Sequence, residues 1–175
     1  MLVSDHGQSG VNGKEPFILE TVTSLDDLIV VDHGSSAFLY LKSPDDHRAT
    51  EIRDAINASW DHGQAILRED APAEWQVTEE GGFADVFVLA DPGYTTFSTR
   101  DKTRFASLGD HGWAPEFKDM WGMFLATGPR LPQGLRIPPV SVVDVYPLML
   151  EIMGLEVSVP VDGDMERLPA LLQPR

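Results

Sequence analysis

Short apolar runs, separated by segments rich in glycine, proline and polar residues, recur along the chain. The runs Leu28–Asp32 and Ala37–Leu41 are rich in β-branched and aromatic residues, and a short polar segment separates them. This arrangement predicts a β-hairpin. The continuous apolar run Val86–Ala90 is typical of a strand buried on both faces, and Met120–Ala126 has the same pattern. A further strand is expected at Ala65–Arg68.

The first helix signal follows the predicted hairpin. Ser43, Pro44 and two aspartates stand in a row, which predicts a serine N-cap, a proline at the first helical position and acidic residues in the first turn. The helix is expected to extend to about Trp60, and Gly63 is expected to end it in the left-handed conformation.

A second helix is predicted near the end of the chain, at Val142–Met153. Ser141 is its candidate N-cap, and Gly154 stands just past its end. Met1–Ser4 is expected to be the end of a strand. Strands and helices therefore alternate, which favours an α/β fold.

The composition narrows the function classes. Among 175 residues, 28 acidic residues outnumber 13 basic ones, and the formal net charge is −15. This balance argues against binding of polymeric nucleic acid, which requires clustered lysine and arginine. A phosphate substrate stays compatible with it if bound divalent cations reverse the local field. The absence of cysteine excludes thiolate metal ligands, and no apolar run reaches the roughly 18 residues of a membrane span.

The triplet Asp-His-Gly occurs four times. Asp32-His33-Gly34 lies between the two hairpin strands and Asp61-His62-Gly63 follows the first helix, so a turn and a helix end are the favoured interpretations there. Asp5-His6-Gly7 follows a strand, and Asp110-His111-Gly112 lies in a loop. Carboxylate and imidazole together suit a divalent cation such as zinc. On spacing alone, metal binding and a plain strand-to-loop turn both stay open for these two triplets.

Longer motifs surround these two triplets. VSDHG at Val3–Gly7, VFVLADPGY at Val86–Tyr94 and GDHGW at Gly109–Trp113 are followed by MFLATGPRLPQGLRIPPVSVVDVYPLMLEIMGL and VDGDMERL. In this order the motifs resemble the nucleotide pyrophosphatase/phosphodiesterase family of the alkaline phosphatase superfamily. The resemblance runs over nearly the whole chain, and GDHGW together with VDVYPLM is far more specific than a bare triplet.

The resemblance implies a fold, a cofactor and a set of ligands. Residues 1–175 would be the C-terminal portion of one alkaline-phosphatase-like three-layer α/β/α sandwich, with about 20–80 as a small, cap-like α/β insert. Two divalent metal ions, zinc above all, would lie at the C-terminal edge of the central sheet beside a threonine nucleophile. Asp5 and His6 would bind one ion and His111 the other, while Asp110 would support the loop.

The family's pattern is incomplete in this chain. In relatives, the nucleophile and the other metal ligands precede SDHG, which begins here at Ser4. The hydroxyls of TTFSTR at Thr95–Arg100 follow a different strand and are not expected to replace the nucleophile. The resemblance therefore implies the C-terminal half of a two-metal phosphodiesterase or nucleotide pyrophosphatase, inactive alone. Its expected partners are a small phosphate-ester or nucleotide substrate and the missing N-terminal half.

Two alternatives stay open. One is another hydrolase of the superfamily, acting on phosphomonoesters, phosphonates or sulfate esters, because the family's substrate choice is made largely by residues near the nucleophile. A non-catalytic metal-binding remnant would hold one ion loosely with Asp5, His6 and His111, without hydrolysis. Whatever the function, loss of the upstream strands of a shared sheet is expected to expose the apolar faces of Val86–Ala90 and Met120–Ala126.

Overall fold

The computed structural model describes residues 1–11, 15–99 and 108–168. The chain divides into two compact units, each with its own apolar core. One is His6–Trp121, and the other joins Met1–Asp5 to the chain from Gly122 onward. Short 3-10 helices occur at Leu19–Thr21, Arg68–Asp70, Ala73–Trp75, Glu79–Gly81, Lys118–Met120, Val142–Asp144 and Met165–Arg167.

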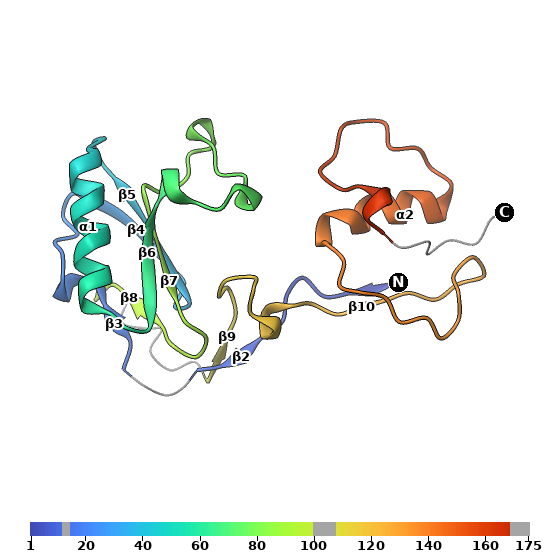
Figure 1. The fold of residues 1–175 in the computed structure, drawn as a ribbon, viewed down its shortest axis with the longest axis horizontal. Coiled ribbons are helices and arrows are strands. Elements are labelled where there is room, and N and C mark those ends of the chain that lie inside the picture. Colours follow the sequence, from blue (N-terminus) through green and yellow to red (C-terminus); the bar gives the residue numbers. More distant parts are fainter. Residues whose placement is uncertain (12–14, 100–107, 169–175) are drawn as a thin grey trace. The chain divides into compact units, whose positions relative to one another are not determined.

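The centre of the unit His6–Trp121 is a four-stranded antiparallel sheet with the order β4-β5-β7-β6 (Figure 1). Its strands are β4 (Leu28–Asp32), β5 (Ser36–Leu41), β6 (Gly63–Leu67) and β7 (Val86–Ala90). The predicted hairpin is confirmed, because β4 and β5 pair along their whole length. The strand predicted at residues 65–68 corresponds to β6, which begins earlier.

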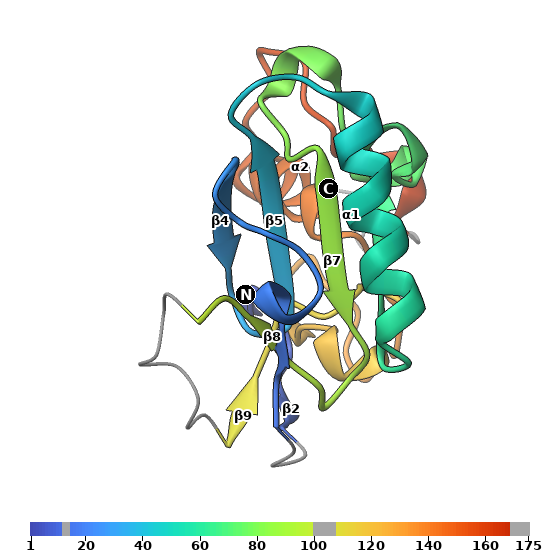
Figure 2. The same cartoon turned by 90° about the vertical axis from the view of Figure 1, so that its left-hand side faces the viewer.

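Helix α1 (Asp46–Ser59) packs along one face of this sheet, as Figure 2 shows. Its buried residues Ala49, Ile52 and Ile56 recur at the three- and four-residue spacing of a single helical face. Full burial of an isoleucine contributes about 1.5–3 kcal/mol, so this face accounts for the docking of the helix. The sheet residues in the same core are Leu28, Ala37, Leu39, Ala65, Leu67, Val86 and Val88.

Both ends of α1 differ from the prediction. The N-cap is Asp45, whose carboxylate accepts a hydrogen bond from the Arg48 N–H at 3.1 Å, so the prediction of a Ser43 cap is wrong. The helix ends at an extended Trp60, and Gly63 begins β6 instead of forming a left-handed cap. Gly63 is needed because a Cβ there would collide with the Trp60 ring.

Strand β7 is buried on both faces, as its sequence predicts. Val86 and Val88 are fully buried on the side of α1, and Phe87 on the opposite side is only 5% exposed. The rings of Phe38 and Trp75 meet Phe87 edge-to-face, each with a centroid distance of 5.9 Å. The expectation that this run is exposed is therefore wrong, because side chains of the same unit cover it.

Two shorter strand pairs lie beside the main sheet. β2 (Ser9–Gly10) runs antiparallel to β9 (Gly109–Asp110). β3 (Phe17–Ile18) runs parallel to β8 (Thr96–Phe97), and Gly34 of the hairpin turn forms an isolated bridge with Thr96. The hairpin turn is thus tied to a segment that follows β7.

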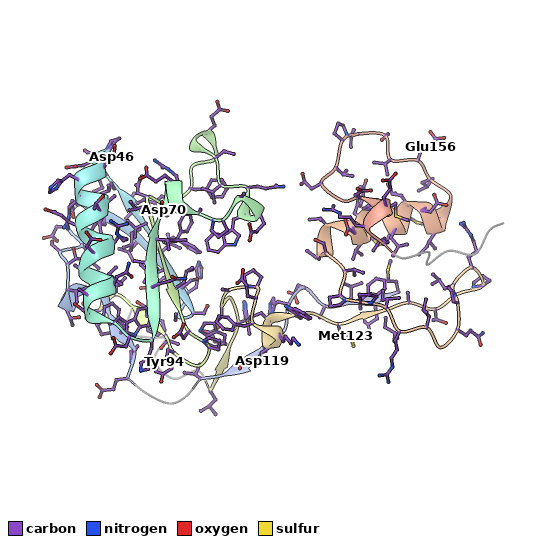
Figure 3. The ribbon with its side chains drawn as sticks, viewed as in Figure 1. Asp46, Asp70, Tyr94, Asp119, Met123 and Glu156 are labelled. Carbon is purple, nitrogen blue, oxygen red and sulfur yellow. The ribbon has the colours of Figure 1, made fainter. Side chains whose placement is uncertain are left out.

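In the other unit, β1 (Leu2–Val3) pairs antiparallel with β10 (Phe124–Leu125). The strand expected at Met1–Ser4 is confirmed, but the prediction of a doubly buried strand at Met120–Ala126 is wrong. Within the part of the chain that the structure describes, β10 pairs with β1 alone, and Met123 is 52% exposed (Figure 3). A strand this short with one neighbour leaves its side chains open to solvent.

Helix α2 (Val145–Met153) gives this unit its core. The 3-10 turn Val142–Asp144 precedes it, so the helical segment begins where predicted, but Ser141 makes no side-chain cap. Pro147 lies in the first turn, where a missing N–H is tolerated. Gly154 ends the helix with φ 73°, as predicted. Neither helix described here is long and apolar enough to cross a bilayer.

Candidate functional site

His6 and His111 lie side by side although they are far apart in the sequence. The strand pair β2–β9 places Ser9 opposite Asp110. Because the two strands are antiparallel, residues before β2 lie beside residues after β9. The two imidazole rings are stacked, with centroids 3.8 Å apart and planes inclined by 17°. The structure therefore brings together two of the three predicted metal ligands.

The glycine of SDHG is required by the close approach of two chain segments. The Gly7 N–H donates to the Met120 carbonyl at 2.9 Å, and a Cβ on Gly7 would collide with the Asp119 carbonyl. The Ser9 hydroxyl donates to the Asp119 carboxylate at 2.8 Å. These contacts hold the chain that follows His6 against the segment that ends the unit.

One ring nitrogen of His6 is engaged in a hydrogen bond. Its Nδ1 lies 2.7 Å from the Gly7 carbonyl oxygen, which can only accept, so Nδ1 carries the proton. In a neutral imidazole, Nε2 then holds the lone pair that a metal ion requires. His6 and His111 are both exposed, which allows an ion to reach them from solvent.

Two side chains bind the backbone of His111. Its N–H donates to Asp110 Oδ1 at 2.9 Å, and its carbonyl accepts from Ser35 Oγ at 2.6 Å. Ser35 is almost fully buried in the turn between β4 and β5. The sequence predicts a turn here only as the connection between the two hairpin strands. It gives no sign of the contact between Ser35 and His111, because these residues are far apart along the chain.

Trp113, the last residue of GDHGW, anchors its loop in the core. It is 4% exposed, and its indole N–H donates to the Tyr94 carbonyl at 3.0 Å. Tyr94 is also the last residue of the motif VFVLADPGY, and its ring stacks on His62 with centroids 3.8 Å apart. The hydrogen bond between Trp113 and Tyr94 thus joins two motifs that are separate in the sequence.

The third predicted ligand, Asp5, is exposed and directly precedes His6. Across the described residues, no group of three or more His, Asp or Glu side chains is arranged to hold a metal ion. The triplet Asp32-His33-Gly34 forms the hairpin turn, as predicted, and its His33 meets the Phe38 ring edge-on. Neither His33 nor His62 joins the pair formed by His6 and His111.

The hydroxyl-rich segment after β7 is packed into the protein. Thr95, Thr96 and Ser98 are 8%, 0% and 4% exposed, and the exposed Thr99 donates its hydroxyl hydrogen to the Glu20 carboxylate at 2.9 Å. Arg100, the last residue of TTFSTR, lies outside the described residues. Buried hydroxyls of this kind are not accessible to a substrate.

An apolar cavity of about 370 Å³ lies over the sheet face opposite α1. Aromatic side chains form much of its wall: Phe38, Tyr40, Trp75, Phe83, Phe87 and Trp113. Its lining, taken over the described residues, includes no Asp, Glu, His, Lys or Arg. The cavity wall is thus mainly apolar, with Ser36 and Tyr40 as its side-chain hydroxyls, and the paired imidazoles of His6 and His111 are the candidate metal-binding groups.

Solved structures show what class of fold this is. The chain superposes on human ectonucleotide pyrophosphatase/phosphodiesterase 5 with a TM-score of 0.83 at 22% sequence identity, covering 98% of this chain and 44% of that one. The murine protein of the same name gives a TM-score of 0.82. The chain thus has a mixed α/β, alkaline-phosphatase-like fold.

Sequence comparison gives the family. The profile described as Type I phosphodiesterase / nucleotide pyrophosphatase matches residues 1–114, and the chain belongs to this family of phosphoric-ester hydrolases. It is 26% identical over 172 residues to bis(5'-adenosyl)-triphosphatase enpp4 of Mus musculus, covering 98% of this chain. It is 27% identical over 180 residues to ectonucleotide pyrophosphatase/phosphodiesterase family member 7 of Rattus norvegicus, covering 99%. The chain spans 36% and 39% of the lengths of these two relatives.

Proposed function

We propose that this chain supplies metal ligands to a two-metal phosphodiesterase or nucleotide pyrophosphatase. The observation that carries the proposal is the stacking of His6, from SDHG, on His111, from GDHG. The substrates would be phosphoric diesters or pyrophosphates, including nucleotides, in keeping with the name of the relative bis(5'-adenosyl)-triphosphatase. Bound cations would also offset the repulsion between an anionic substrate and a chain of net charge −15.

Asp5, His6 and His111 would supply part of a two-ion site, with zinc as the expected metal. Imidazole nitrogen and carboxylate oxygen are ordinary zinc ligands. By the family resemblance, Asp5 and His6 would bind one ion and His111 the other, as expected for two-metal hydrolases. Because zinc sites use at least three protein ligands, further ligands are expected from the part of the family's sequence that this chain does not match.

When bound, the two ions would activate a hydroxyl nucleophile and neutralise charge on the phosphoryl oxygens during in-line displacement. The residues of this chain contribute orientation. The Nδ1–H of His6, bound to the Gly7 carbonyl, sets the tautomer in which Nε2 is the donor nitrogen. The hydrogen bonds to the backbone of His111 hold the second ring in register with the first.

Calorimetric titration with zinc tests the ligands. His6→Ala and His111→Ala are each expected to weaken zinc binding at least about tenfold. Loss of a residue that only supports a metal ligand already has an effect of this order. His33→Ala and His62→Ala are matched controls, because these rings contact Phe38 and Tyr94 instead. Equal heats of zinc binding for the wild type and His111→Ala would show that His111 is not a zinc ligand.

A chromogenic phosphodiester, bis(p-nitrophenyl) phosphate, tests catalysis. With zinc, the 175-residue chain is expected to show no turnover, because the resemblance places the nucleophile before SDHG. Turnover by the chain alone would overturn that assignment. Adding a polypeptide with the upstream part of the family's sequence is expected to restore turnover. If the mixture of the two polypeptides stays inactive, the non-catalytic alternative is favoured. If it prefers p-nitrophenyl phosphate or sulfate as substrate, another hydrolase of the superfamily is favoured.

A further inference from the structure

We infer that Ser35 is a positioning residue for the metal site, acting through the backbone of His111. The inference rests on the proposed function, since it assigns to Ser35 the task of holding a metal ligand in place. It also gives a second role to the hairpin turn that begins with Asp32-His33-Gly34, which the sequence explains by turn geometry alone.

Ser35 and Asp110 bind His111 at both of its backbone polar groups. The Ser35 hydroxyl donates to the His111 carbonyl at 2.6 Å, and Asp110 Oδ1 accepts the His111 N–H at 2.9 Å. The imidazole of His111 is exposed, whereas Ser35 is 1% exposed. An exposed ring on a fixed backbone is the arrangement expected of a ligand that binds an ion from solvent without large reorganisation.

Two glycines allow the hairpin turn and the GDHGW loop to approach this closely. Gly34 has φ 86°, and a Cβ there would lie 2.6 Å from Asp110 Oδ2. Gly112 has φ 90°, and a Cβ there would lie 2.8 Å from Ser35 Oγ. Each triplet therefore contributes a glycine whose missing side chain makes room for the other segment.

The turn that carries Ser35 is itself fixed by the sheet. The Ala90 N–H donates to the Ser35 carbonyl at 3.0 Å, and the His33 N–H donates to the Ser36 carbonyl at 2.8 Å. On its other side, the Thr96 N–H donates to the Gly34 carbonyl at 2.7 Å. Because β7 and the segment after it both bind the turn, the position of the Ser35 hydroxyl is set by the folded core.

The test compares Ser35→Ala with Ser36→Ala, the same substitution at a neighbouring buried residue. Zinc affinity of the 175-residue chain is measured by competition with a chromogenic chelator, and the visible absorption of bound Co²⁺ reports ligand geometry. Ser35→Ala is expected to weaken zinc binding roughly tenfold and to change the Co²⁺ spectrum. Ser36→Ala is expected to leave both unchanged, and circular dichroism checks the fold of each variant.

A double-mutant cycle with His111→Ala separates positioning from general support of the fold. If Ser35 acts through His111, Ser35→Ala has no further effect on zinc affinity once His111 is removed. If Ser35→Ala does not fold, Asp110→Ala tests the other hydrogen bond to the His111 backbone and is expected to weaken zinc binding in the same direction.

The outcomes distinguish this inference from the proposed function. If removal of His6 and of His111 leaves zinc affinity unchanged, the proposed metal site is wrong. If those variants lose zinc but Ser35→Ala matches Ser36→Ala, the site stands and the positioning role of Ser35 is overturned.

Discussion

The imidazole ring of His6 stacks on that of His111, with centroids 3.8 Å apart. The relationship follows from a short ladder in which Ser9 pairs with Asp110, and from the fixed backbone on either side. Two motifs that are separate in the sequence thus form one exposed pair of imidazole rings, and each contact that produces the pair can be tested.

The stack itself predicts a ring-current effect in the metal-free protein. His6→Ala is expected to shift the imidazole proton resonances of His111, because the aromatic ring above them is removed. Tyr94→Leu is the matched control: it is expected to shift the resonances of His62, which stacks on Tyr94, and to leave His111 unchanged. Proton–nitrogen correlation spectra of the histidine rings give the measurement, and an unmoved His111 in His6→Ala would contradict the stack.

Gly7→Ala is expected to destabilise the protein by at least about 2 kcal/mol. Its new methyl group would occupy the place of the Asp119 carbonyl, so the β2 segment would be forced away from its neighbour. Gly10→Ala, in the nearby strand β2, is the matched control, because its Cβ would lie an ordinary 3.9 Å from the Leu108 carbonyl oxygen. Urea denaturation gives both values, and equal midpoints would show that the two segments are not held this closely.

Arg167→Met is expected to destabilise the other unit by about 1–3 kcal/mol. The carboxylate of Asp144 is 2% exposed; its Oδ1 forms an ion pair with the Arg167 guanidinium at 2.8 Å and accepts a hydrogen bond from the Asp164 N–H, also at 2.8 Å. Without the guanidinium, the buried carboxylate of Asp144 loses the positive charge that offsets the cost of its burial. Hydrogen exchange of the amides in α2 and in the segment that follows it gives the measurement.

Glu151→Gln is the control for that prediction. Glu151 forms an ion pair with Arg130 in the same unit, but its side chain is 50% exposed. A solvent-exposed pair contributes less than about 1 kcal/mol, so exchange is expected to change little. Similar protection in both variants would mean that the bonds to Asp144 do not support the unit.

The ion pair between Asp27 and Arg48 predicts a loss of stability in acid. Arg48 Nε donates to the Asp27 carboxylate at 2.8 Å, and this hydrogen bond lowers the pKa of Asp27 below its ordinary value of 3.8. A pKa lowered by folding favours the ionised form in the native state. The contribution is therefore fully present above pH 3.8 and is lost as the pH falls through the folded pKa.

Asp27→Asn is expected to remove this part of the acid sensitivity. Because the Asp27 side chain is 48% exposed, the difference from wild type is expected to be at most about 1 kcal/mol at neutral pH and to shrink toward pH 2. Asp61→Asn, at an exposed aspartate after α1, is the control. Denaturation midpoints between pH 2 and 7 test the prediction, and parallel curves for wild type and Asp27→Asn would contradict it.

The elements whose signals are local were predicted well. The hairpin, β7 and the left-handed Gly154 each depend on propensity and patterning within a few residues. The ends of α1 were less predictable, because Ser43 and Asp45 are both good N-caps and only the packed helix selects Asp45. The apolar run at Met120–Ala126 was misjudged, since burial on both faces depends on neighbours that no local pattern reveals.

For the site, the sequence by itself determined which side chains are suited to chemistry. Asp5, His6 and His111 lie in motifs specific enough to indicate the family, and their side chains carry the donor atoms that the proposed metal site requires. Only the tertiary structure decided that His6 meets His111, that Ser35 holds the latter's backbone, and that Trp113 ties its loop to the core. These contacts join segments distant along the chain, and the position of each partner is set by the packing of the sheet between them.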